Sequence, residues 1–251
     1  MHKLTIKSKK EIEKMRESGK RLAQVRGQLM EKVAVGVNAA EIEELAMSLI
    51  KKSGGKASFA MVPGYSWATC INVNEGVVHG IPKPEIVFES GDVVSVDVGL
   101  IYDGFHSDTS SSKLLGSDPK KQELLKIGRD SLKAGIAQAS SGNLVGDISR
   151  AMGEVLEQGG MKAVKSLSGH GIGRELHEDP RVPCTEMGSE DEYVPLREGM
   201  TLAIEVMYTD GSGLIKLEKD GWTISTRDGR ISALFEETVA VTSRGPIILT
   251  I

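Results

Sequence analysis

The sequence predicts an α+β fold built from two similar halves, on the basis of two observations. Two amphipathic helix patterns come first and are followed by strand-like segments. The same order (helix, helix, strands) begins again near residue 118. Grouped helices and grouped strands are typical of α+β proteins. The two halves share no obvious sequence identity, so the doubling rests on element order.

The first half begins with two helices that each carry a start signal. Ser8 and Asn38 are N-cap residues, and a glutamate follows each by three positions, the spacing of a capping box. Apolar residues then recur at helical spacing over 12–29 and over 42–49. Gly54-Gly55 ends the second helix. The strand-like segments that follow are Trp67 to Val78, Val93 to Leu100 and a strand that begins near Ser107.

The second half repeats this order. Asp118-Pro119 opens a helix, because proline is favoured in a first helical turn. Another helix is expected from about Asp147 to Gln158, and strands are expected over 201–208 and 231–241. We therefore expect a single domain over residues 1–251, with pseudo-halves of about 1–115 and 116–251.

Composition excludes several classes of protein. Of the 251 residues, 39% are apolar and 26% are charged, as in soluble globular domains. A net charge of −4 gives no sign of a nucleic-acid-binding surface. The beginning of the chain lacks the apolar core of a secretory signal, and no apolar run is long enough for a membrane span. Two cysteines fit a reducing compartment, so we expect a cytoplasmic location.

A predicted hairpin brings two aspartates together. Asp103-Gly104 is a strong turn signal, and with these residues in the turn Asp97 faces Ser110. Asp108 then faces Gly99, so the two aspartates are diagonal neighbours roughly 7–8 Å apart on one face. Converging carboxylates repel unless a cation lies between them. Two solvated aspartates, or a register shifted by one residue, are the alternatives.

Three further segments supply candidate ligands. His170 lies among glycines in Ser168–Arg174, Glu205 ends an apolar strand, and Glu236-Glu237 interrupts another. Buried carboxylates are costly unless they are paired or bind metal. Strand alternation allows only one of Glu236 and Glu237 to face the site. A structural histidine and surface acids are the alternatives. Carboxylates with one imidazole suit Mn, Fe, Co or Zn, and several carboxylates favour two ions.

Together these segments resemble the type I, bacterial methionine aminopeptidases of metallopeptidase family M24. The resemblance extends over essentially the whole chain. It implies the pita-bread fold, in which two pseudo-symmetric α+β halves surround a central metal cleft. It also implies removal of the initiator methionine before a small second residue, by metal-activated water attack on the first peptide bond. The matching segments are Asn74–Pro82, Asp97–Asp108, Ser168–Arg174, His177–Pro180, Glu198–Glu205 and Phe235–Thr238.

The resemblance assigns five metal ligands. Asp97 would chelate one divalent ion, and Asp108 and Glu236 would bridge it to another. His170 and Glu205 would complete the second ion's ligands. Glu205 would also act as a general base toward water. Cobalt, manganese, iron and zinc all fit this ligand set.

The same resemblance assigns residues that contact substrate. His177 would contact the oxygen of the scissile amide, and His79 would assist near its nitrogen. Tyr65, Cys70 and Trp222 would line the pocket for the methionine side chain. Ordinary core or polar surface positions are the alternatives for these five residues.

The chain departs from the family pattern in four places. Val206 stands where proline is usual, and Glu237 stands where histidine is usual. Leu176 occupies a position where an aromatic residue is usual, and Phe59 replaces a smaller residue. Neither Val206 nor Glu237 removes a ligand. We expect Glu237 to point away from the site, and we expect these two changes to tune rate and metal preference.

Two other functions stay open at this point. An Xaa-Pro aminopeptidase or prolidase shares the fold but usually carries an extra N-terminal domain. A non-catalytic pita-bread protein that binds nucleic acid or a ribosome typically lacks metal ligands. For the aminopeptidase, the expected partners are nascent polypeptides that begin with methionine, together with a transient ribosome contact. We expect a monomer with no membrane or specific nucleic-acid partner.

Overall fold

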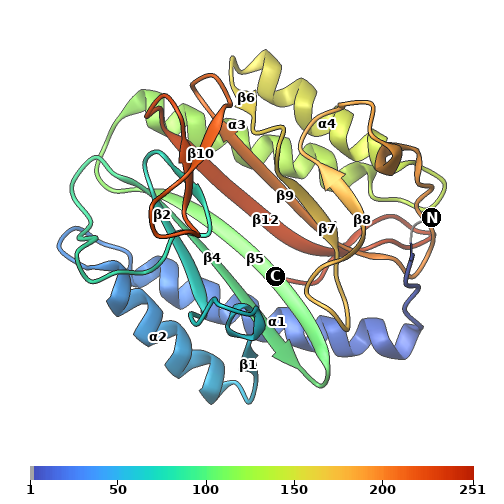
Figure 1. The fold of residues 1–251 in the computed structure, drawn as a ribbon. Coiled ribbons are helices and arrows are strands. Elements are labelled where there is room, and N and C mark those ends of the chain that lie inside the picture. Colours follow the sequence, from blue (N-terminus) through green and yellow to red (C-terminus); the bar gives the residue numbers. More distant parts are fainter. Residues whose placement is uncertain (1–2) are drawn as a thin grey trace.

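A curved antiparallel sheet and the helices packed on it form the body of the protein, which a computed structural model describes over residues 3–251 (Figure 1). The described helices are α1 (Lys9–Lys32), α2 (Ala39–Lys52), α3 (Pro119–Gln138) and α4 (Val145–Gln158), with 3-10 turns η1 (Phe59–Met61) and η2 (Glu190–Tyr193). The strands are β1 (Lys56–Ala57), β2 (Thr69–Val73), β3 (Gly76–Val78), β4 (Val93–Tyr102), β5 (Phe105–Leu114), β6 (Lys162–Ala163), β7 (Ser168–Gly171), β8 (Glu178–Pro183), β9 (Thr201–Thr209), β10 (Ile215–Leu217), β11 (Ile224–Thr226), β12 (Ser232–Ala240) and β13 (Ile247–Ile248). The α+β class predicted from the sequence is confirmed.

Local sequence signals explain where three of the helices begin. The side chains of Ser8 and Asn38 accept hydrogen bonds from the backbone N–H groups of Glu11 and Glu41. Each glutamate side chain in turn accepts the backbone N–H of its cap residue. Asp118 caps α3 with proline in its first turn. Each cap satisfies N–H groups that have no partner inside the helix. These predicted helix starts are confirmed.

The main sheet runs in the order β1-β4-β5-β12-β9-β7-β8, with β2, β6 and β13 paired beside this path. Helices α1 and α2 pack on the part of the sheet built by the first half, and α3 and α4 pack on the part built by the second (Figure 1). Each helix pair has its own apolar core, one centred on β4 and the other on β9 and β12. Strands β5 and β12 meet at the seam between the halves.

The separate three-stranded sheet, β10-β11-β3, lies beside the main one. It changes one sequence expectation, because the predicted strand Trp67 to Val78 is two strands. Asn74 breaks it with a left-handed backbone (φ 52°), and its side chain bonds to Asp92 and to the N–H of Val93. Asparagine tolerates this conformation because its amide bonds locally.

Other elements also differ from the sequence expectation. Helix α4 begins at Val145, because Asp147 occupies the third helical position and accepts the N–H of Leu144. Strands β7 and β8 were not predicted, since glycine-rich β7 lacks an apolar alternation. None of the helices within residues 3–251 has the length and apolar character needed to cross a bilayer.

Candidate metal centre and active-site cleft

The hairpin of β4 and β5 has the register that the sequence predicts. Tyr102 pairs with Phe105 around the Asp103-Gly104 turn, whose backbone is left-handed at both residues. Asp97 pairs with Ser110, and Asp108 pairs with Gly99. Side chains two residues apart share a face of a strand. Asp97 and Asp108 are therefore diagonal neighbours on one face, and the shifted register is excluded.

Strand pairing extends this face into a row of carboxylates. Ser110 pairs with Glu236 on β12, and Glu236 pairs with Glu205 on β9. On the other side, Asp97 pairs with Cys70 on β2. Directly paired residues point to the same face of a sheet. The pairing therefore aligns Asp97, Glu236 and Glu205 along one line that crosses both halves of the molecule.

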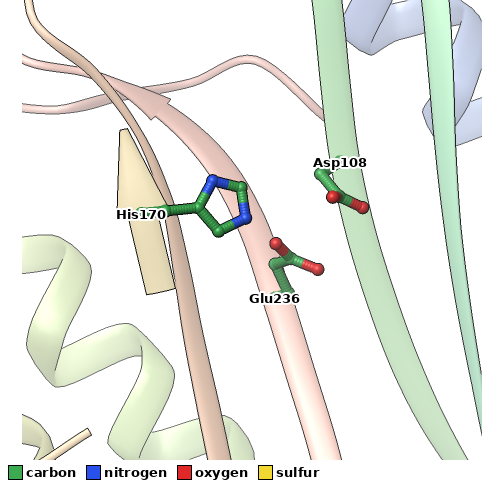
Figure 2. A group of neighbouring side chains, drawn as sticks. All are labelled: Asp108, His170 and Glu236. Atoms are coloured by element: carbon green, nitrogen blue, oxygen red, sulfur yellow. The ribbon is translucent and has the colours of Figure 1, made fainter. Parts of the chain in front are cut away.

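His170 reaches the same face from β7. It pairs with Ala203, which lies two residues before Glu205 on β9. The imidazole of His170 and the carboxylates of Asp108 and Glu236 point toward one another from three strands (Figure 2). One ligand atom from each of these three buried side chains lies within 4.8 Å of the others. Asp97 and Glu205 share the row and face but lie outside this tightest group.

The two aspartates of this centre are buried, and each has an oxygen without a hydrogen-bond partner. Within residues 3–251, Oδ1 of Asp97 and Oδ1 of Asp108 are buried without a hydrogen-bond partner. Burial raises the pKa of Asp97 to about 7. Burial and then neighbouring carboxylates raise the pKa values of Asp108, Glu205 and Glu236 well above normal. Buried acids that lack donors are what a divalent cation satisfies, so the donor set fits such a group.

The hydrogen bond of His170 prepares its ring for ligation. Nδ1 lies 2.8 Å from the carbonyl oxygen of Gly171, which can only accept, so Nδ1 carries the proton. Burial, followed by the nearby His177, lowers the pKa of His170 to about 3. The ring is therefore neutral at physiological pH. Nε2 is left with its lone pair, the form in which imidazole binds metals.

The metal centre lies in a cleft of about 1000 Å³. Among the residues that line the cleft are all ten candidates singled out from the sequence: Tyr65, Cys70, His79, Asp97, Asp108, His170, His177, Glu205, Trp222 and Glu236. The rings of His170 and His177 meet edge to face, with centroids 4.5 Å apart. Surrounding protein lowers the pKa values of His79 and His177, and His177 adds to the effect at His79.

One end of the cleft is apolar. Tyr65 meets Trp222 edge to face with ring centroids 5.1 Å apart, and the Tyr65 hydroxyl donates to the Thr69 carbonyl oxygen at 2.8 Å. Cys70 and Leu176 belong to the same apolar cluster. Phe59 and Trp222 also pack in this cluster. The five residues give an apolar compartment beside the carboxylate row.

The two departures on the central strands leave the carboxylate face intact. Glu237 points to the opposite face, where its carboxylate bonds to Arg26 of α1 at 2.8 Å and also to Thr109 and Thr250. Val206 is fully buried opposite Phe235 in the second-half core. Glu236 is therefore the acid on the cleft side.

Four further residues that line the cleft were not assigned a role from the sequence. Val62 and Phe105 line the apolar side, and Lys7 lines the cleft with Glu178 near His177. Phe105 follows the Asp103-Gly104 turn directly, which was a usable signal. Lys7 lies in a segment with no motif, and only tertiary packing brings it to the cleft.

Comparisons with known proteins agree with this geometry. The model of metallopeptidase family M24 matches residues 13–243. The methionine aminopeptidase of Aquifex aeolicus is 39% identical over 98% of each chain. That of Clostridium perfringens is 39% identical over 99% of each chain. The solved methionine aminopeptidase of Thermotoga maritima superposes with a TM-score of 0.95 at 40% identity, covering 98% of this chain and 99% of that one.

More distant solved structures share the fold alone. The prolidase of Pyrococcus furiosus has a TM-score of 0.78 at 24% identity, and this chain covers 65% of its length. Together the neighbours identify the architecture as the pita-bread fold, with two pseudo-symmetric halves around the cleft. The chain belongs to metallopeptidase family M24, among its methionine aminopeptidases.

Proposed function

We propose that this protein is a metal-dependent aminopeptidase that removes the initiator methionine from newly made proteins. The observation that carries the proposal is the row of carboxylates and His170 placed directly beside an apolar compartment in one cleft. Relatives named methionine aminopeptidases, at 39% identity over nearly the whole chain, support the same activity.

Five residues would hold two divalent ions: Asp97, Asp108, His170, Glu205 and Glu236. The unsatisfied oxygens of the two aspartates and the free Nε2 of His170 support this ligand set. When bound, the ions supply Lewis acidity, which polarises the scissile carbonyl, lowers the pKa of water and keeps the carboxylates ionised. Co, Mn, Fe and Zn all suit these ligands.

Two neutral histidines and one carboxylate handle the reacting amide. Their lowered pKa values keep His79 and His177 neutral near pH 7, so each ring has one N–H donor and one acceptor. His177 donates to the carbonyl oxygen as negative charge develops there. His79 assists at the amide nitrogen, which must gain a proton to leave. Glu205 accepts the proton of the attacking water at its carboxylate.

The apolar end of the cleft selects methionine. Tyr65, Cys70 and Trp222 bind the side chain, and the packed rings exclude water from the adjacent carbonyl. Apolar burial contributes about 0.8 kcal/mol per CH₂, so a flexible thioether of matching length gains most in a filled pocket. Phe59 and Leu176 set the depth of this pocket in our proposal.

The wider setting follows from the same function. We propose one catalytic domain over residues 1–251, with pseudo-halves of about 1–115 and 116–251, in agreement with the two separate apolar cores. The enzyme acts in the cytoplasm as a monomer, on nascent chains that begin with methionine, and contacts the ribosome transiently. Two buried, unpaired cysteines agree with a reducing compartment.

Peptide specificity tests this function. The purified enzyme, supplied with Mn²⁺, is given Met-Ala-Ser, Met-Trp-Ser and Ala-Pro-Ser, and released amino acid is measured. We expect methionine from Met-Ala-Ser and little product from the others, because space beside the scissile bond is limited. Preferential cleavage of Ala-Pro-Ser would favour the Xaa-Pro aminopeptidase, which the similarities do not favour.

A further inference from the structure

Lys7 and Glu178 form a buried ion pair at the edge of the cleft. Their side chains are 5% and 6% exposed, and Nζ of Lys7 contacts Oε2 of Glu178 directly. Nζ also donates to Thr5 Oγ1 at 2.6 Å, and that hydroxyl donates to the same carboxylate oxygen. A buried pair of charges persists only when its geometry and hydrogen bonds compensate for lost hydration. The hydrogen bonds of Thr5 and Lys7 to Glu178 supply this compensation.

The other oxygen of Glu178 closes the loop that carries His177. Oε1 accepts the backbone N–H of Arg174 at 2.9 Å and that of Glu175 at 3.3 Å. His177 precedes Glu178 directly in the chain. The Glu178 carboxylate thus joins the loop of residues 174–178 to the N-terminal segment, residues 3–7.

The N-terminal segment is itself anchored to the core. The N–H of Lys7 donates to the carbonyl oxygen of Gly199 at 2.7 Å, and the N–H of Gly199 donates to Val241. Leu4 forms a bridge with Asp179 beside the loop. At Gly173 a Cβ would lie 2.3 Å from Cε of Lys7 and 2.7 Å from Oε1 of Glu178, so a larger residue here would displace the ion pair. Backbone hydrogen bonds and close packing therefore hold the segment that carries Lys7 in place.

The ring of His177 has no comparable restraint of its own. Within the part of the chain that the structure describes, its imidazole has no hydrogen-bond partner, and its ring contact is the edge of His170. The position of the ring over the cleft therefore depends on the loop backbone. Whatever holds residues 174–178 determines where the N–H of His177 points.

We propose that Lys7 and Glu178 are positioning residues, which clamp the loop so that His177 points at the scissile carbonyl. The inference rests on the proposed function for the role of His177, but the contacts of the clamp do not depend on it. The N-terminal segment thus becomes part of the active-site scaffold. Neither Lys7 nor Glu178 is a catalytic group in this proposal, because neither side chain contacts the carboxylate row.

A double-mutant cycle tests the coupling. Lys7→Met removes the charge while keeping an unbranched apolar stem, and His177→Ala removes the group that the clamp positions. We expect Lys7→Met to lower kcat for Met-Ala-Ser at least tenfold in the natural protein and less than twofold in His177→Ala. Non-additivity of this kind reports that two residues act together. An equal fold-loss in both backgrounds would overturn the proposal.

Matched variants separate positioning from general damage. Lys113→Met removes another partly buried lysine, which donates to Met30 and Val33 on the far side of β5. We expect it to lower the melting temperature without lowering kcat. If Lys7→Met does not fold, Thr5→Val removes one hydrogen bond from the same carboxylate with little change in volume. A smaller loss that again disappears in His177→Ala supports the clamp, and an undiminished loss refutes it.

A spectroscopic measurement works without turnover. The chain has five histidines, so the imidazole Cε1–H signals of the zinc-loaded protein are few, and His177→Ala assigns one of them. Lys7→Met is expected to shift or broaden that signal, whereas Lys113→Met should leave it unchanged. An unmoved signal in Lys7→Met would refute the clamp. If Lys7→Met shifts the signal while the natural protein releases no methionine, the proposed function is refuted and the clamp stands.

Discussion

Glu205 and Glu236 are paired directly across β9 and β12, so a partly buried carboxyl group faces a buried one on the cleft side of the sheet. Asp97 joins the same row through Ser110. Like charges directly opposite each other destabilise a sheet, and burial adds to the cost. The site is therefore arranged at the expense of stability, and a bound cation offsets that cost.

Glu205→Gln should stabilise the metal-stripped protein, by about 1 kcal/mol, because it replaces a carboxyl group whose ionisation burial and the nearby Asp97 oppose in the folded state. Urea unfolding after chelation measures the change. In contrast, Mn²⁺ at 100 times its Kd should stabilise the natural protein by about 2.7 kcal/mol. The variant should gain much less from Mn²⁺. A stripped variant that is less stable than the stripped natural protein would show that Glu205 does not destabilise the metal-free fold.

Asp108→Ala and Glu236→Ala should each abolish methionine release and metal retention, since both carboxylates belong to the tightest ligand group. Metal content after desalting and release from Met-Ala-Ser measure the two effects. Ser111→Ala is the control, because Ser111 lies on β5 with its side chain on the opposite face from Ser110. A variant of Asp108 or Glu236 that keeps both metal and turnover would exclude the two-ion assignment.

The pair of Arg26 and Glu237 should contribute to stability more than to chemistry. Both side chains are 16% exposed, and Arg26→Met leaves a mostly buried carboxylate without its cation. We expect a loss of about 2 kcal/mol in unfolding free energy, most of which the double variant Arg26→Met/Glu237→Gln recovers. Chemical denaturation measures the cycle. Additive losses would show that the pair is not coupled.

Trp222→Ala should weaken substrate binding. The ring is partly exposed and packs on Tyr65, so its removal opens one wall of the apolar compartment with limited effect on folding. We expect KM for Met-Ala-Ser to rise about tenfold, equivalent to about 1.4 kcal/mol, with kcat changed less. Steady-state kinetics with Met-Ala-Ser give both constants. An unchanged KM would remove Trp222 from the pocket.

His106 should make the free energy of unfolding decrease as the pH falls below about 6.5. Burial lowers its pKa to about 4, and its Nδ1 bonds to the hydroxyl of Ser58. Because the folded pKa lies below the unfolded value near 6.5, the stabilisation is complete above pH 6.5 and is lost as pH falls toward 4. The loss amounts to about 3 kcal/mol.

His106→Gln isolates this effect from the other acid-sensitive groups. Urea unfolding of both metal-stripped proteins at pH 7 and pH 4.5 supplies the comparison. We expect the free energy of unfolding to fall less in His106→Gln over this interval. Parallel losses in the two proteins would mean that His106 titrates normally.

Local signals explain what the sequence predicted well. The register of β4 and β5 follows from the Asp103-Gly104 turn, and alternation then decides that Asp97 and Asp108 share a face. The capping residues before α1 and α2 likewise predict where these helices begin, because their hydrogen bonds join residues only three positions apart. The choice between Glu236 and Glu237 came from the family pattern, and the strand alternation places Glu236 in the cleft.

Features that depend on tertiary contact could not be predicted in this way. The clamp of Lys7 and Glu178 joins residues 171 positions apart and has no periodic signal. The break at Asn74 depends on Asp92 in a neighbouring segment. The pairing of Glu205 with Glu236 required the order of strands, which the hydrophobic pattern leaves open.

Metal add-back shows whether methionine release depends on a divalent ion in the cleft. The protein is stripped of metal, Mn²⁺, Fe²⁺, Co²⁺ or Zn²⁺ is restored singly, and methionine release from Met-Ala-Ser is measured beside Leu-Ala-Ser. We expect no release without metal, recovery with at least one ion, and weak cleavage of the leucine peptide. A folded protein that releases no methionine with any of the four ions would exclude a metal-dependent methionine aminopeptidase and favour a non-catalytic pita-bread protein.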